Sequence, residues 1–133
     1  MMHNSQFRVY YEDTDLAGIV YHANFLKFIE RGRSDMVAEM GVDQTALKAE
    51  QDIVFAVRRM QLEFIRPAKF GDLLEVTSFI GPVQGAQFDM SQQVSCEGHV
   101  LFDAELTLVG LHSDGRPARL PQSLRDILNS AQD

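Results

Sequence analysis

A chain of 133 residues has room for one domain, and 45% hydrophobic residues are enough for one core. The net charge of −7 argues against a nucleic-acid-binding protein, which usually presents a basic face. The single cysteine, Cys96, permits no internal disulfide, and no apolar run approaches the ~18 residues of a membrane-spanning helix. We therefore expect one cytoplasmic domain over residues 1–133, with no secretory leader, no membrane span and no nucleic-acid partner.

The N-terminal third of the chain carries strand, loop and helix signals in turn. Residues 6–11 are rich in β-forming side chains and predict a first strand, which an irregular acidic loop follows. Apolar side chains then recur at helical spacing over residues 24–40 and predict a long amphipathic helix. Asn24 suits the N-cap of this helix and Gly41 its C′ position. Gly32 lies on the apolar stripe, where we expect it to allow close approach to a sheet.

The rest of the chain changes to a period of two. After a short helix predicted at residues 43–50, apolar and polar side chains alternate and predict four strands between residues 53 and 111. Gly81-Pro82 is expected to close the second of these strands, and Pro121 to open a short terminal helix. The alternation predicts an α+β fold in which an antiparallel sheet wraps around the long helix. Its edge strands favour a dimer or a higher oligomer.

An acidic loop leads directly into the predicted long helix. Residues 11–25 read Tyr-Glu-Asp-Thr-Asp-Leu-Ala-Gly-Ile-Val-Tyr-His-Ala-Asn-Phe. The first N–H groups of a helix have no partner within it, so they can hold an oxyanion, and a carboxylate in the preceding loop can act on the same substrate. The spacing alone does not make the acid catalytic, because loop aspartates more often bond their own turn.

This loop, with Phe-Ile-Glu-Arg-Gly-Arg at residues 28–33, resembles the signature of the YbgC-type acyl-CoA thioesterases. These enzymes form part of the 4-hydroxybenzoyl-CoA thioesterase branch of the hotdog-fold superfamily. The resemblance continues through residues 55–60 and 65–68 and ends at residues 116–121. It implies a hotdog fold and hydrolysis of a short-chain or aromatic acyl-CoA to free acid and coenzyme A.

The resemblance also assigns roles to residues of the motif. It implies Asp15 as the catalytic carboxylate, acting as general base or nucleophile. The helix start over Ile19–His22 would supply the oxyanion hole, chiefly through the N–H groups near Tyr21 and His22. The remaining substrate-binding positions would be Gly18, Ile19, Val20 and Asn24.

Three neighbouring side chains have weaker assignments. The His22 imidazole orients water or the thioester in one reading and is only structural in another. Glu30 is a rival base, since a second hotdog lineage places its acid on the central helix. Asp13 is expected to bond its own turn rather than to take part in catalysis.

Coenzyme A carries phosphate groups, so an acidic protein needs a local cationic patch to hold it. Arg58 and Arg59 are candidates for substrate binding, although regular alternation would place them on opposite faces of their strand. No cofactor is expected, because coenzyme A is part of the substrate. No metal site is expected either, because no His/Cys/Asp cluster has metal-ligand spacing.

The proteins that this chain resembles are often encoded beside the Tol-Pal envelope system, and some are linked to acyl carrier protein. The resemblance therefore implies acyl-CoA as substrate, acyl carrier protein as an alternative acyl donor, and a homodimer or homotetramer. Two other functions stay open. One is a non-catalytic module that binds acyl carrier protein or an envelope complex. The other is a hotdog enoyl-CoA hydratase, whose Gly-Asp-x-Asn-Pro-x-His sequence is absent here.

Overall fold

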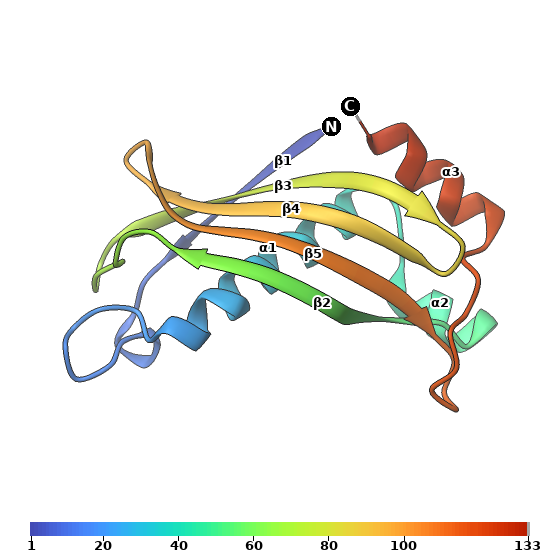
Figure 1. Cartoon of the computed structure of the whole chain (residues 1–133), viewed down its shortest axis with the longest axis horizontal. Helices are drawn as coiled ribbons and strands as arrows, with labels where there is room; N and C mark the ends of the chain where they lie inside the picture. The colour runs from blue at the N-terminus through green and yellow to red at the C-terminus, as the bar shows by residue number, and fades with distance from the viewer. Residues whose placement is uncertain (133) are drawn as a thin grey trace.

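The computed structural model describes residues 1–132. Five strands form one antiparallel sheet in the order β1-β3-β4-β5-β2, and the long helix α1 lies against one of its faces (Figure 1). This α+β arrangement is the hotdog fold that the resemblance implies. The elements are β1 (Met2–Arg8), the 3-10 turns η1 (Tyr11–Asp13) and η2 (His22–Asn24), α1 (Phe25–Glu39), α2 (Gln44–Gln51), β2 (Val54–Phe64), β3 (Leu73–Gln84), β4 (Gln87–Cys96), β5 (His99–Leu111) and α3 (Gln122–Ala131).

The core lies between α1 and the sheet. The apolar stripe of α1, which includes Phe28, Ile29 and Met36, is buried. A Cβ atom at Gly32 would lie 2.5 Å from Cγ1 of Val76, so helix and sheet touch there and the expected role of this glycine is confirmed. No helix among residues 1–132 is long and apolar enough to cross a membrane.

Two strand boundaries differ from the sequence-based expectation. The first strand spans β1 rather than residues 6–11, because its inward positions carry the polar residues His3 and Ser5, which hide the alternation. The strand β3 does not end at Gly81-Pro82 but continues to Gln84. Its pairing with β4 shifts register between Ile80 and Val83, so the proline lies in an irregularity where its missing N–H costs no ladder bond.

Candidate active site

The acidic loop is a tight turn held by its own backbone. The N–H of Asp15 donates to the carbonyl of Ile19 at 2.9 Å, and the N–H of Gly18 donates to the carbonyl of Asp15 at 3.0 Å. Gly18 has a φ of +79°, which a side chain would strain. Asp15 Oδ1 accepts the N–H of Ala17 at 2.9 Å. The exposed carboxylate is therefore oriented through one oxygen, while Oδ2 makes no hydrogen bond within residues 1–132.

The neighbouring acid, Asp13, has a structural role. Its buried carboxylate accepts the N–H of Tyr10 at 2.8 Å, which confirms the expectation that it bonds its own turn. Its carbonyl oxygen accepts the N–H of Tyr21 at 2.9 Å and the side-chain amide of Asn24 at 3.0 Å. Asp13 thus fastens the acidic loop to the start of the helix.

The helical turn begins at His22, so of the predicted helix start over Ile19–His22 only His22 is helical. Ile19 and Val20 are extended, and the N–H of Val20 donates to the carbonyl of Ala68 at 2.8 Å. The N–H of Tyr21 is bound to Asp13 and is no longer available. Within residues 1–132, no hydrogen bond uses the N–H of His22 or of Ala23, which are the first two positions of η2.

Asn24 occupies the N-cap position of α1, but its side chain caps no helical N–H. The amide instead donates to Asp13, as described above. The expected side-chain cap is therefore absent, because η2 continues directly into α1 and supplies its N-terminal turn. The Asn24 amide is committed to the fold, and its expected contact with substrate stays a prediction.

An apolar cavity of about 270 Å³ opens beside the start of α1. His22 and Phe25 line it from the helix side, and the end of β2 with the following segment closes the opposite side. The imidazole of His22 meets the ring of Phe64 edge-on, with 6.0 Å between centroids. The lining residues are Ile19, Val20, His22, Phe25, Phe64, Ile65, Arg66 and Pro67.

The structure does not bring every predicted residue to this cavity. Asp15, Gly18 and the ring of Tyr21 are exposed and do not line it in the single chain. The Tyr21 ring packs at a tilt on His22, with centroids 4.5 Å apart. Figure 1 shows the loop between β1 and α1, the start of α1 and the end of β2 at the same end of the molecule. The residues of the apolar cavity, the N–H groups of His22 and Ala23 and the exposed carboxylate of Asp15 belong to these segments and to the residues that follow β2.

The two predicted arginines lie on the same face of the sheet. Val57 pairs with Leu108 and Arg59 with Thr107, so Arg58 is an extra residue in a β-bulge. Arg58 Nη1 donates to Oε1 of Gln87 at 2.9 Å, on the face turned away from α1, which we call the outer face. The expectation that the two arginines point to opposite faces is therefore wrong.

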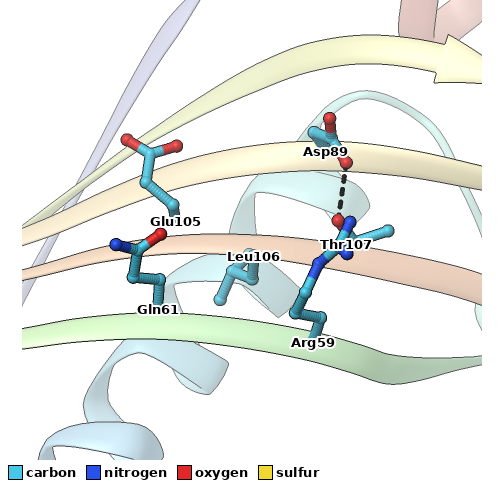
Figure 2. A pocket seen from close by; sticks show the side chains of 6 residues that line it. All are labelled: Arg59, Gln61, Asp89, Glu105, Leu106 and Thr107. Carbon is cyan, nitrogen blue, oxygen red and sulfur yellow. Dashed lines mark hydrogen bonds between the residues drawn. The ribbon is translucent and has the colours of Figure 1, made fainter.

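On the outer face, Arg59 borders a polar hollow of about 400 Å³. Figure 2 shows its side chain reaching from β2 towards Thr107 on β5, whose hydroxyl donates to Asp89 at 2.8 Å. Among residues 1–132, neither Arg58 nor Arg59 has a carboxylate within ion-pair distance. This hollow is larger than the apolar cavity, but its lining does not combine an acid with free backbone N–H groups, so we take the start of α1 as the candidate active site.

Comparison with known proteins finds relatives that match most of the chain, including both the start of α1 and the outer face of the sheet. Residues 9–128 match the family described as the Thioesterase-like superfamily. The chain is 39% identical over 119 residues to the acyl-CoA thioester hydrolase YbgC of Escherichia coli, with 88% of each chain covered. The chain belongs to the thioesterase-like superfamily.

Two further relatives agree with this assignment. The acyl-CoA thioesterase YbgC of Helicobacter pylori is 31% identical over 133 residues, which cover 92% of this chain and 97% of the relative. The crystal structure of a probable thioesterase from Bartonella henselae has a TM-score of 0.87 and 38% identity, and it covers 91% of this chain and all of that one. As a member of this superfamily, the chain is a thioester hydrolase. The relatives give no support to the hydratase or to the non-catalytic module.

The contribution of the β2 end to the apolar cavity was not predicted from the sequence. Phe64 and Ile65 are half exposed although both are large and apolar, and Arg66-Pro67 follows them on the same wall. The available signal was the break in apolar–polar alternation at the end of the strand, followed by a proline. It identifies an irregular segment but does not say what the segment faces.

Proposed function

We propose that this chain hydrolyses acyl-CoA thioesters, with Asp15 as the catalytic carboxylate and the N–H groups of His22 and Ala23 as the oxyanion hole. The observation that carries the proposal is the pair of unpartnered N–H groups at the start of α1, beside an apolar cavity and directly after the acidic loop. The E. coli and H. pylori relatives, named as acyl-CoA thioester hydrolase and acyl-CoA thioesterase, support the choice of substrate.

The chemistry follows from where charge develops. Attack on the thioester carbonyl moves negative charge onto its oxygen, and each preorganised N–H donor at that oxygen is worth roughly 3–4 kcal/mol. The carboxylate of Asp15 either takes a proton from the attacking water or attacks the carbonyl itself, and coenzyme A leaves as the thiol. In single-turnover hydrolysis in ¹⁸O-water, unlabelled acid product identifies Asp15 as the nucleophile, because water then opens the mixed anhydride at the Asp15 carbonyl and leaves a carboxylate oxygen on the acyl group.

We further propose that two copies pair through their β2 edges. β2 is the outermost strand at its side of the sheet, and large apolar side chains on or just after it are exposed, namely Val54, Val57, Phe64 and Ile65. Antiparallel pairing of β2 with itself sets the Phe64 end of one copy beside the Val54 end of the other. The cavity at the start of α1 then meets the Phe55–Val57 segment of the second copy. Light scattering on the purified chain tests this dimer, and a tetramer would be a pair of such dimers.

The paired arginines support a site for the nucleotide of coenzyme A on the outer face. Two arginines on one face of the sheet, neither with a carboxylate within ion-pair distance in residues 1–132, favour binding of phosphate in a chain of net charge −7. Replacement of Arg58 and Arg59 by glutamine should raise KM for acyl-CoA and leave KM unchanged for a short acyl-pantetheine. Hydrolysis of acyl-carrier-protein substrates, measured alongside, decides between the two acyl donors.

The free thiol of Cys96 and the acyl-CoA substrate both support a cytoplasmic location.

The decisive variant is Asp15→Asn. Asparagine keeps an acceptor for the N–H of Ala17, so the turn should survive, while the base or nucleophile is lost. We expect kcat to fall by at least about 10³-fold, with an unchanged melting temperature. Glu12→Gln is the matched control, because it removes an exposed acid from the same loop. Turnover at the normal rate in Asp15→Asn would rule out the assignment.

A further inference from the structure

A glutamine is buried in the apolar core beneath the middle of α1. Gln92 of β4 is 0% exposed, and its amide nitrogen donates to the carbonyl of Ile29 at 2.8 Å and to Oγ of Ser78 at 2.9 Å. Its amide oxygen accepts a hydrogen bond from Nη1 of Arg33 at 3.1 Å. A buried amide is costly unless it is bonded, and here both ends of the amide are used. The glutamine therefore holds Arg33 in a fixed place.

Arg33 has more donors than this contact uses. Burial lowers the pKa of its guanidinium from the ordinary value, and the Glu30 carboxylate opposes that change. Within residues 1–132, its guanidinium makes no hydrogen bond other than the one to Gln92, and no carboxylate lies within ion-pair distance. A half-buried guanidinium with unused N–H groups is suited to binding an oxygen atom of a ligand.

These unused donors border a cavity of about 170 Å³ between α1 and the sheet. Its polar rim carries Arg33 and Glu30, and Oγ of Ser34 donates to Oε1 of Glu30 at 3.1 Å. Gln44 adds a further polar group to the lining, and the apolar part of the wall comes from Val37, Phe55, Val57, Phe88 and Leu108. An apolar cavity of about 150 Å³ accepts a benzene ring, so this one has room for a group of that size.

We propose that Arg33 is a specificity-determining residue that selects acyl groups with a hydroxyl at the far end, and that Gln92 is the positioning residue that holds it. The inference rests on the proposed function, in which pairing of β2 edges brings this cavity next to the catalytic end of the other copy. A hydroxyl accepts from the guanidinium and donates to Glu30 at once. A carboxylate at the far end of the acyl group would be repelled by the Glu30 carboxylate. An alkyl end would offer the Arg33 guanidinium no hydrogen-bond acceptor.

The test compares matched acyl-CoA pairs that differ by one hydroxyl: benzoyl against 4-hydroxybenzoyl, and hexanoyl against 6-hydroxyhexanoyl. The readout is the ratio of kcat/KM between the two members of a pair, with adipoyl-CoA as the anionic comparison. We expect the hydroxylated member to be favoured by about tenfold or more, as for a hydrogen bond to a charged group. Arg33→Met should bring the ratio close to one.

Arg31→Met is the matched control, because it removes the same charge from an exposed position on α1, where the guanidinium lies over the ring of Phe28. It should leave the ratio unchanged. Gln92→Met should lower the kcat/KM ratio although residue 92 does not contact the ligand, because Arg33 loses the group that holds it. A loss of folded protein affects both substrates equally, so it does not change this ratio. Ser78→Ala is the milder variant if Gln92→Met does not fold.

Three results would overturn the inference. They are an unchanged ratio in Arg33→Met, faster turnover of adipoyl-CoA than of 6-hydroxyhexanoyl-CoA, and hydrolysis by the wild-type chain without preference for the hydroxyl. Failure of the wild-type chain to hydrolyse any acyl-CoA would instead refute the proposed function. Hydrolysis without preference for the hydroxyl would leave that function in place and remove only the role of Arg33.

Discussion

Replacement of Gly32 by alanine sets two effects of similar size against each other. Alanine favours the helix by about 1 kcal/mol relative to glycine. Its Cβ, however, would lie 2.5 Å from Cγ1 and 3.0 Å from Cβ of Val76, a buried β-branched residue with few alternative rotamers. Overpacking of this kind costs about 1–3 kcal/mol, and so short a contact belongs at the upper end. We therefore expect Gly32→Ala to lower the free energy of unfolding by about 1–2 kcal/mol.

A double-mutant cycle with Val76→Ala isolates the contact. Val76→Ala removes the atom nearest to the new Cβ and on its own should cost about 2 kcal/mol through lost burial and a small cavity. In that background, Gly32→Ala should be about 1–2 kcal/mol less destabilising than in the parent, because the contact with Cγ1 is gone and only the 3.0 Å approach to the Cβ at position 76 still opposes the propensity gain. Urea unfolding followed by circular dichroism, at one fixed protein concentration, measures all four free energies. Additive costs, or a Gly32→Ala chain as stable as the parent, would refute this account of the helix–sheet contact.

Two further predictions concern single groups. Tyr21 has φ −58° and ψ 129°, which suit a residue before proline, so His22→Pro should delete one oxyanion donor and lower kcat by about 10²–10³-fold. His22→Ala keeps that N–H, and an equally slow His22→Ala enzyme would move the effect to the imidazole. Burial, followed by the carboxylates of Asp72 and Glu97, raises the pKa of the Cys96 thiol. At pH 8 less thiolate is then present than in glutathione, so iodoacetamide should alkylate Cys96 more slowly, and equal rates would contradict the raised pKa.

The long helix and its contacts could be predicted because their signals are local. Apolar side chains at helical spacing placed α1, and Gly41, with a φ of +92°, ends it as expected. The strand β1 was misplaced because its inward residues His3 and Ser5 face α1, where His3 bonds Glu39 at 2.7 Å. Such a polar inward face contradicts the simple alternation on which the prediction rests.

The details of the site depend on contacts between distant segments. Val20 reads as part of an apolar helix start, but its hydrogen bond to Ala68 pulls it into an extended bridge and moves the free N–H groups onwards to His22. The bulge at Arg58 exists only in the pairing of β2 with β5, so no property of the strand alone reveals it. The acidic loop with its glycine and the helix after it were therefore predictable from the sequence. The N–H groups that stay free, and the face of the sheet on which Arg58 and Arg59 lie, were not.

The different roles of Asp13 and Asp15 affect how the results of a genetic screen are interpreted. A screen that scores only growth or enzyme activity in cells would return changes at both aspartates as equivalent losses. At Asp13 the buried carboxylate holds the N–H of Tyr10, and a substitution would leave that N–H without its partner inside the fold, so its variants should be less abundant on an immunoblot. At Asp15 the protein should accumulate at normal abundance, and its inactive copies would compete with active ones for partners in a cell that makes both.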